Sequence, residues 1–482
     1  MPMPPCDGSR SGDATPHVPL IIQGGMGVGI SAWPLARAVA SRGQMGVVSG
    51  VALDRILAIR LQEGDPGGHH HRALRHFPIP GVAQRILERY GDAEAFAQTG
   101  RYSSPPMFSE RPETELLELA VAAAFVEVWL AKEGHDGVVG MNLLEKIQTP
   151  TLPLIYGAML AGVDYVIMGA GIPRDIPAHM DRLARHEPCA LRLHVANGAD
   201  GEMLFDPALF GHVLPAIRRP GFLAIVSSEV LARSLVRSGG VNGLIVEGHT
   251  AGGHNAAPRR GPPGERSPVY GPDDDVACER IAALGVPFWL AGGFGHGDGL
   301  MRAQASGAVG IQVGTAFALC RDSSMVPALR RRCVQAILDG TVSVRTDGRC
   351  SPTGFPFKLL DLGGTAGASD APLVERMPCL HGYLRHVYRR DDGSLGWRCP
   401  AEPTSLWAAK GGLADESLGR ICLCNALIAT IGHHHGWPRQ EHALPLVTTG
   451  DDINCVAAIA QTAGLDYSAA DVLDALLPPA VG

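Results

Sequence analysis

The sequence has few charges, no block of positive charge and no long apolar run. Charged residues make up only 18% of the 482 residues, and Lys+Arg 41 against Asp+Glu 48 leaves a net charge of −7. We therefore expect no nucleic-acid partner and no binding to an anionic membrane surface. Nowhere do about 18 apolar residues run without a charge or a Gly/Pro break, so no membrane-spanning helix is expected either.

The cysteines and the first residues also lack the patterns of a secreted protein. Cysteine occurs eleven times, an odd number, without the spacing of a disulfide scaffold. Residues 1–17 are rich in Pro, Ser, Gly and Asp and contain no apolar signal-peptide core. We expect a cytoplasmic protein with reduced thiols and a flexible tail at residues 1–17.

Aromatic residues are scarce as well, at 5%, whereas Gly 61 and Pro 37 are abundant. This balance favours a fold with many tight turns and with ligand loops lined by glycine. Hydrophobic residues reach 46%, which is enough for a large core and excludes global disorder. The length fits one large α/β barrel with additions, or two to three modules.

Eight short apolar runs, most of which end in glycine, alternate with helix-like stretches. The runs are too short for helices and lack the alternation of a half-exposed strand, so they are typical of parallel strands buried on both faces. The pattern predicts an α/β fold of the (β/α)8 TIM-barrel type, with a doubly wound open sheet as the alternative. The runs are residues 19–25, 45–50, 137–142, 165–171, 222–228, 243–248, 287–293 and 310–315.

Three segments depart from this rhythm. Residues 54–132 contain Pro/Gly breaks and a long Ala/Leu/Glu/Val-rich helix, and residues 188–220 add a strand-like segment and a short helix. We expect both to be insertions in barrel loops, where extra length is tolerated. After residue 345 turn signals and a cluster of four cysteines replace the alternation. We interpret residues 18–345 as the barrel and residues 346–482 as a C-terminal extension packed on it, because no low-complexity linker separates them.

The turns after the last two predicted strands favour a phosphate site. Barrels bind ligands at the carboxyl ends of their strands. Gly292 and Gly293 follow the seventh strand and Gly314 and Thr315 the eighth, and a helix-like stretch comes after each turn. The backbone N–H groups of two such turns can hold a phosphate dianion. The alternative is that these glycines only make tight turns.

One histidine is expected at the carboxyl ends of the barrel strands, where barrel enzymes have their active sites. His254 follows a glycine pair after the sixth predicted strand, so we take it as the candidate catalytic residue. His249 precedes the glycine pair and is expected to be a loop residue. The run at residues 69–71 has no second ligand set at helical spacing, so no metal site is expected there.

Four cysteines fall within 46 positions of the extension, in a C-x-C pair and two single positions. Four thiolates could bind zinc or an iron–sulfur cluster, although the spacing is not that of a zinc ribbon. The alternative is that they are buried thiols, which pack as small hydrophobic groups. We assign no metal ligands. The four residues are Cys379, Cys399, Cys422 and Cys424.

Taken in order, several of these motifs resemble the nitronate monooxygenase (2-nitropropane dioxygenase) family and the related flavin-dependent enoyl-acyl-carrier-protein reductases. The resemblance covers about residues 18–325. It implies a TIM barrel that binds FMN without a covalent link, with His254 of the AGGH motif facing the flavin. The motifs are PLIIQGGMG (19–27), GVVGMN (137–142), VIMGAGIP (166–173), IVEGHTAGGH (245–254), PFWLAGGFG (287–295) and GIQVGTAF (310–317).

The resemblance also implies which residues contact FMN, all of them at the ends of predicted strands. They are Gly24, Gly25, Met26, Asn142, Gly169, Ala170, Gly171, Ser227, Gly252, Gly253, Ala291, Gly292, Gly293, Gln312, Gly314 and Thr315. The long insertion and the extension depart from familiar members of the family, and either could reshape the substrate pocket.

The implied activity is FMN-dependent oxidation of a small nitronate or nitroalkane with O2. His254 would hydrogen-bond the anion, or remove a proton from the neutral nitroalkane. An NAD(P)H-dependent enoyl-thioester reductase is the alternative enzyme. A third hypothesis is a flavin-binding protein with vestigial catalysis, whose extension docks a partner. The oligomeric state stays open, with a homodimer as one candidate.

Overall fold

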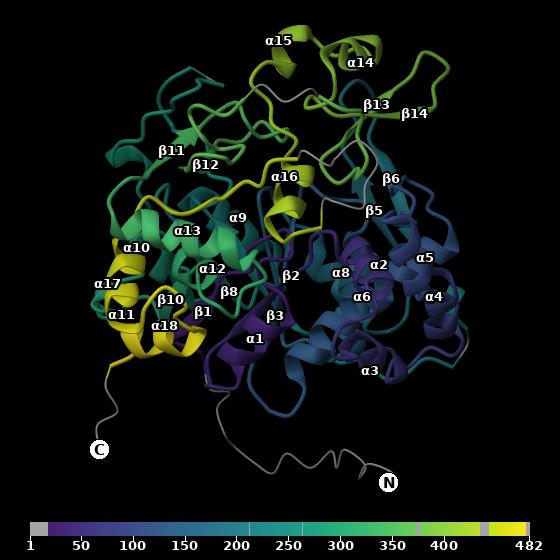
Figure 1. Ribbon diagram of the computed structural model, residues 1–482, viewed down its shortest axis with the longest axis horizontal. Helices are drawn as coiled ribbons and strands as arrows, with labels where there is room; N and C mark the ends of the chain where they lie inside the picture. Colours follow the sequence, from purple (N-terminus) through teal and green to yellow (C-terminus); the bar gives the residue numbers. More distant parts are fainter. Residues whose placement is uncertain (1–17, 212, 263, 373–375, 434–442, 479–482) are drawn as a thin grey trace.

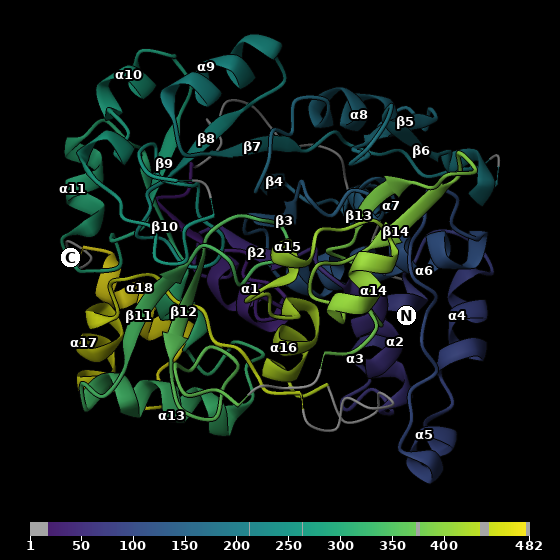
Figure 2. The ribbon, with the colours of Figure 1, turned by 90° about the horizontal axis from the view of Figure 1, so that it is seen from above.

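The computed structural model describes residues 18–211, 213–262, 264–372, 376–433 and 443–478. The tail expected at residues 1–17 lies outside this part of the chain. Figures 1 and 2 show the chain from two directions at right angles.

Eight parallel strands form the centre of the molecule, in the order β1-β10-β9-β8-β7-β4-β3-β2. An isolated parallel bridge between Ile22 and Met45 joins the two ends of this sheet, so the sheet closes into a barrel. This confirms the TIM-barrel prediction over the open sheet. The strands are β1 (Ile21–Gln23), β2 (Gly46–Ser49), β3 (Val139–Leu144), β4 (Tyr165–Gly169), β7 (Gly221–Val226), β8 (Gly243–Glu247), β9 (Phe288–Ala291) and β10 (Gly310–Val313).

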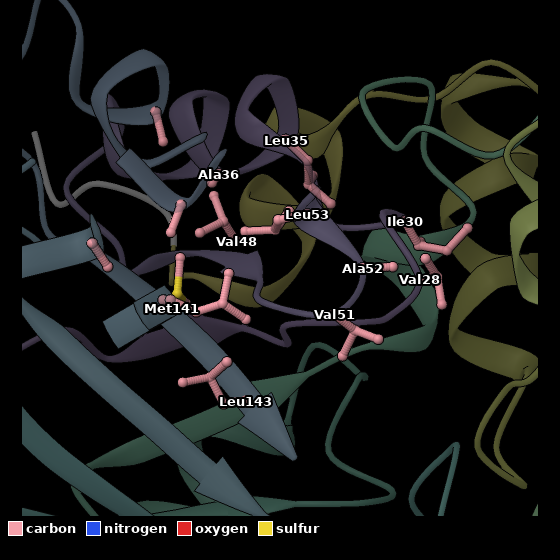
Figure 3. Close-up of a cluster of buried hydrophobic side chains, with 14 of the residues drawn as sticks. Val28, Ile30, Leu35, Ala36, Val48, Val51, Ala52, Leu53, Met141 and Leu143 are labelled. Carbon is pink, nitrogen blue, oxygen red and sulfur yellow. The ribbon is translucent and has the colours of Figure 1, made fainter. Parts of the chain in front are cut away.

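The two faces of the barrel strands bury different clusters. One cluster gathers side chains of alternate strand residues, among them Val47, Ile167, Ile245 and Trp289, and fills the barrel interior. The residues between them, such as Val48 and Met141, belong to the large cluster beneath the outer helices. Figure 3 shows both side chains in one cluster with Leu35 of the first outer helix. Burial on both faces explains why the strands appear in the sequence as unbroken apolar runs.

Helices surround the barrel. They are α1 (Trp33–Ala40), α6 (Thr114–Lys132), α7 (Thr151–Leu160), α8 (Ile176–Leu183), α9 (Glu229–Ser238), α10 (Cys278–Ala282), α11 (Gly299–Ala305), α12 (Thr315–Ala318) and α13 (Pro327–Leu338). Helix α6 packs against both α1 and α7. It therefore takes the place of the barrel's own outer helix between β2 and β3, although it falls within the segment 54–132.

The remaining parts of the two predicted insertions form small additions. Four helices follow β2, and a hairpin with a short 3-10 helix stands between β4 and β7. At the right of Figure 2, α4 and α5 lie outside α6. The elements are α2 (Leu53–Gln62), α3 (His69–Arg75), α4 (Val82–Tyr90), α5 (Ala93–Thr99), β5 (Cys189–Leu193), β6 (Gly201–Phe205) and η1 (Pro207–Phe210).

The C-terminal segment covers two regions of the barrel. In Figure 1, α14 and α15 lie at the top, whereas α17 and α18, in yellow, lie beside the barrel. Helix α17 contacts α13, and α18 contacts α1. Buried residues of this segment, such as Leu423 and Val472, share one hydrophobic cluster with the barrel. Its elements are β11 (Ser343–Asp347), β12 (Phe357–Asp361), β13 (His386–Arg389), β14 (Leu395–Arg398), α14 (Thr404–Ala409), α15 (Ala414–Ser417), α16 (Leu423–Thr430), α17 (Asn454–Ala463) and α18 (Ala469–Leu476). The short 3-10 helix η2 (Pro272–Asp274) instead lies between β8 and α10.

Among the helices of the described residues, none combines the length and the apolar composition that crossing a membrane requires.

Candidate active site

A cavity of about 710 Å³ lies at the carboxyl ends of the barrel strands. His254 and every residue that the sequence predicted to contact FMN line this cavity. They are Gly24, Gly25 and Met26 after β1, Asn142 in β3, Gly169, Ala170 and Gly171 at the end of β4, Ser227 after β7, Gly252 and Gly253 after β8, Ala291, Gly292 and Gly293 at the end of β9, and Gln312, Gly314 and Thr315 at the end of β10. The structure thus brings together residues that are up to 291 positions apart, from Gly24 to Thr315.

Some of these glycines are required by packing against protein. A Cβ atom on Gly25 would lie 2.3 Å from the Cβ of Asn142, which no side chain tolerates. A Cβ on Gly252 would lie 2.8 Å from the backbone carbonyl carbon of Thr449. For these two positions the close approach of the chain to itself is a sufficient reason for glycine.

Other glycines border open space instead. A Cβ on Gly253 would meet no heavy atom within 4 Å, and the nearest neighbours of Gly293 and Gly314 would be 3.6 Å and 3.7 Å away. The N–H groups of Gly293 and Gly314 are therefore free to contact a ligand in the cavity, whereas the N–H of Gly253 already donates to Oγ1 of Thr448.

The predicted phosphate cradle has free backbone donors. We find no hydrogen bond from the N–H groups of Gly292, Gly293, Gly314 or Thr315 to any other described residue. Helix α12 begins at Thr315, whereas α11 begins only at Gly299, so only the second turn leads directly into a helix. Four unpaired N–H groups on one cavity wall suit an anionic group with several oxygens.

Several buried polar atoms on the cavity wall also lack a partner within the described part of the chain, including one on Asn142 and one on Thr449. The side chain of Asn142 donates from Nδ2 to the carbonyl of Gly25 at 3.0 Å, but its Oδ1 has no hydrogen-bond partner among the described residues. The same holds for Oγ1 of Thr449. A buried polar group that is left unsatisfied costs about 1–3 kcal/mol, so a ligand that can pair with these atoms is favoured.

The imidazole of His254 is held by the segment that follows the barrel. Its Nε2 lies 2.7 Å from Oγ of Ser351, and its ring meets the ring of Phe357 edge-on, with centroids 4.8 Å apart. The backbones of His254 and Phe357 form an antiparallel bridge. Burial lowers the pKa of His254 to about 4, so the side chain is neutral near pH 7.

His249 also lines the cavity but has a different environment. Its ring stacks on that of Tyr270, with centroids 4.8 Å apart and 10° between the planes. The expectation that it is a loop residue stays a prediction.

Glu247, the last residue of β8, lines the cavity and was not among the predicted site residues. Burial raises the pKa of its carboxyl group to about 8, which leaves the group mostly protonated at neutral pH. The available signal was a single acidic residue at the end of a strand that is otherwise apolar.

A second group that the sequence did not reveal is the wall contributed by the C-terminal segment. It includes residues of the loop before β12, of α16 and of the stretch before α17. The lining residues are Phe355, Phe357, Tyr383, Leu384, Leu423, Cys424, Leu427, Thr448, Thr449, Gly450, Asp452 and Cys455. No local motif marks them, because they reach the cavity only through tertiary packing.

Tyr383 of this wall is anchored by the segment after β2. Its hydroxyl donates to Oδ1 of Asp54 at 2.7 Å, and both side chains are buried. Burial raises the pKa of Asp54, whose neighbour Arg55 donates to the carbonyls of Pro105 and Leu380. The helices after β2 thus hold the wall in place from outside the cavity.

The cysteines of the extension are all free thiols, and burial raises their pKa values. Cys424 lines the cavity. In the described part of the chain, no group of three or more His, Cys, Asp or Glu side chains is arranged to hold a metal ion.

Comparison with known proteins locates the family signal in the second half of the barrel. The family model for nitronate monooxygenase matches residues 220–351. The nitronate monooxygenase of Pseudomonas aeruginosa is 30% identical over 148 residues, 29% of this chain and 38% of that protein. The (3aS,4S,5R,7aS)-5-hydroxy-7a-methyl-1-oxo-octahydro-1H-indene-4-carboxyl-CoA dehydrogenase of Mycobacterium tuberculosis is 39% identical over 114 residues, 23% of this chain and 29% of that protein. The chain thus matches well under half of the length of these relatives.

Two solved structures are similar over most of the chain at low identity. The match to FabK from Thermotoga maritima covers 95% of this chain and 91% of the FabK chain, with a TM-score of 0.48 and 14% identity. Nitroalkane oxidase from Streptomyces ansochromogenes covers 95% and 94%, with a TM-score of 0.40 and 16% identity.

The matched segment contains four barrel strands, β7 to β10, together with His254 and both glycine turns of the cradle. The family model and the two relatives thus confirm, over this segment, the resemblance to nitronate monooxygenases that the sequence motifs predicted.

Proposed function

We propose that this protein is an FMN-dependent oxidoreductase that oxidises a small nitronate, or a related anion, with O2. One observation carries this proposal: a neutral histidine, His254, and four unpaired backbone N–H groups line the same cavity. FMN, when bound, supplies the redox chemistry, and the protein supplies position and charge.

The residues of the cavity suit FMN. The N–H groups of the two glycine turns at 292–293 and 314–315 would hold its phosphate. Oδ1 of Asn142 would accept a hydrogen bond from a polar edge of the flavin, which would satisfy an atom that is otherwise unpaired. We prefer FMN to FAD because the cradle fits a terminal phosphate and the sequence contains no separate adenylate-binding motif.

The state of His254 favours an anionic substrate. A histidine whose pKa is lowered to about 4 is a weak base, and each unit of pKa by which it falls short of the carbon acid costs about 1.4 kcal/mol. Proton removal from a neutral nitroalkane is therefore the harder task. A nitronate arrives already deprotonated and needs only a hydrogen-bond donor, which neutral imidazole provides.

A second candidate is a reductase or dehydrogenase of acyl thioesters that uses the same cavity. It is favoured by the similarity to the carboxyl-CoA dehydrogenase of Mycobacterium tuberculosis, which is 39% identical over its matched segment.

One experiment separates the two candidates. The purified full-length protein, with its bound flavin identified by chromatography, is mixed anaerobically with propionate-3-nitronate, 2-nitropropane and NAD(P)H in turn. We expect rapid loss of flavin absorbance with the nitronate and its return when O2 is admitted. Rapid bleaching by NAD(P)H alone would favour the reductase, and a protein without flavin would exclude both.

A further inference from the structure

We propose that Ser351 is a positioning residue that, together with Thr353, fixes the tautomer of His254 so that Nδ1–H points to the cavity. The inference rests on the proposed function only in placing His254 beside the substrate. It makes the segment after the barrel a part of the active site, through a residue that does not itself touch the substrate.

Ser351 is well placed to act on one ring nitrogen. Its side chain is fully buried, with 0% exposure, and its Oγ lies 2.7 Å from Nε2 of His254. Nδ1 of His254 makes no hydrogen bond to any other described residue, although the ring lines the cavity. In a neutral imidazole only one ring nitrogen carries a proton. If Ser351 donates to Nε2, then Nδ1 is protonated and is a donor to a ligand; if Ser351 accepts from Nε2, then Nδ1 is an acceptor.

Ser351 is in turn bonded to Thr353. Its Oγ lies 2.8 Å from Oγ1 of Thr353 and accepts the backbone N–H of Thr353 at 3.2 Å. Oγ1 of Thr353 accepts the backbone N–H of Phe355 at 3.3 Å. The three side chains form a chain of hydroxyl, hydroxyl and imidazole.

Counting donors and acceptors shows in which direction the hydroxyl groups of Thr353 and Ser351 donate their hydrogen bonds. If Thr353 donates to Ser351 and Ser351 donates to Nε2, both hydroxyl protons are used and only Nδ1–H remains, facing the cavity. If the direction is reversed, the hydroxyl proton of Thr353 has no acceptor among the described residues and Nδ1 keeps a free lone pair. The first arrangement leaves fewer unpaired groups, and a fully paired polar chain is the more stable one.

The chemical consequence is a fixed hydrogen-bond donor on the cavity wall. An Nδ1–H group attracts an anionic substrate, whereas a free lone pair would serve as a base. A donated hydrogen bond to Nε2 also stabilises the neutral ring, in agreement with its lowered pKa. Ser351 would thus commit His254 to binding an anion.

The tautomer can be measured without turnover. The purified full-length protein is labelled with ¹⁵N- and ¹³C-histidine, and the two tautomers are distinguished by their ring chemical shifts. The signal of His254 is identified by its loss in His254→Gln. We expect the Nδ1–H tautomer in the wild type and a mixture of tautomers in Ser351→Ala. An Nε2–H tautomer in the wild type, or an unchanged tautomer in Ser351→Ala, would overturn the proposal.

A control variant separates positioning from stability. Ser417 is equally buried and bonds Oγ1 of Thr404 at 2.9 Å, in α15. Ser417→Ala should lose a similar amount of stability but keep the His254 tautomer. Ser351→Thr, which keeps the hydroxyl, should retain the Nδ1–H tautomer wherever thermal unfolding shows that it folds.

A second readout links the tautomer to binding. With nitronate as substrate, Ser351→Ala should raise KM by about 10-fold while kcat changes less, because the donor is present only part of the time. If the tautomer shifts as expected but nitronate is not turned over by the wild type, then the proposed function fails and the positioning role of Ser351 stands. A tautomer shift with unchanged KM would contradict the link to anion binding.

Discussion

At the scale of single residues, two side chains on the cavity wall have pKa values far from their ordinary ones. His254 is held neutral by a lowered pKa and Glu247 is held protonated by a raised one, and burial is the first cause in each case. Glu247 is the last residue of β8, and His254 lies in the loop that follows. The same desolvated environment therefore leaves both the acid Glu247 and the base His254 uncharged, although they are only seven residues apart in the sequence.

Replacing His254 by Ala should leave the flavin bound but slow flavin reduction by the substrate about 10²-fold or more, the usual scale for a positioned acid–base or donor group. The reason is that the substitution removes the ring and leaves the backbone of the cavity intact. Anaerobic stopped-flow absorbance measures the rate. His249→Ala serves as the control, and its effect should be smaller because that ring is occupied by stacking on Tyr270. Reversed effects in the two variants would mean that the catalytic histidine was misassigned.

Glu247 should make stability depend on pH. Its pKa is about 8 in the folded protein, against 4.5 for an ordinary glutamate, so in this window the folded state binds more protons than the unfolded state. The contribution of Glu247 to stability should then fall as pH rises from about 5 to 8, by at most about 1.4 kcal/mol for each pH unit. Above about pH 6.5 the lowered pKa of His254 adds no opposing slope. Glu247→Gln should remove this slope, as measured by urea unfolding at several pH values.

Glu229 offers the matched control for this pH dependence. It is an acid whose pKa is lowered, first by its hydrogen bond from Arg280, so Glu229→Gln should not flatten the slope between pH 5 and 8. The role given to the burial of Glu247 would be wrong if the wild type and Glu247→Gln had parallel pH profiles.

At the scale of elements, the contact between α6 and α7 depends on one glycine. A Cβ atom on Gly157 would lie 2.0 Å from the carbonyl oxygen of Val121, so the two helix backbones leave no room for a side chain. Gly157→Ala should therefore destabilise the protein by about 1–3 kcal/mol, although alanine is the better helix former by about 1 kcal/mol. Thermal unfolding measures the loss. Gly363→Ala, at a position with nothing within 4 Å, should change little. An unchanged melting temperature in Gly157→Ala would show that the helices can move apart at no cost.

The elements that the sequence revealed best are those with a simple burial pattern. The barrel strands are buried on both faces and are bounded by glycine, so short apolar runs were sufficient to find all eight. Helix α6 was found as a helix but attributed to an insertion. Of its residues, those from Leu116 to Val128 are buried without interruption, so no amphipathic stripe indicated which neighbours it would have.

The glycine turns show where the sequence is insufficient. Gly252 and Gly253 look alike in the sequence, yet one is fixed by the backbone of Thr449 and the other borders open space. The neighbour that distinguishes them lies 197 positions beyond Gly252. Every residue that the motif resemblance assigned to FMN contact lines the cavity, whereas Glu247 and the wall from the C-terminal segment were recognised only from the fold.

At the scale of the whole molecule, the segment after the barrel and the segment after β2 are joined by the buried pair of Tyr383 and Asp54. Tyr383→Phe should cost about 1–3 kcal/mol, because it removes the donor to a buried carboxyl group. Thermal unfolding followed by circular dichroism and by the fluorescence of released flavin should shift together. Tyr388→Phe is a suitable control, since its ring lies in the peripheral β13–β14 hairpin. A shift in the flavin signal alone would mean that Tyr383 acts only on the cavity.

The position of Thr448, Thr449 and Gly450 on the cavity wall has a consequence for biosynthesis. The ribosome releases the chain from its N-terminus at about 5–20 residues per second, so the barrel strands emerge on the order of ten seconds before this stretch does. During that interval the loop that carries His254 lacks Thr448, which later accepts the N–H of Gly253 at 2.9 Å. Capture of the flavin should thus be one of the last events in the maturation of the protein, and a nascent chain stalled before residue 448 should emerge without a completed binding site.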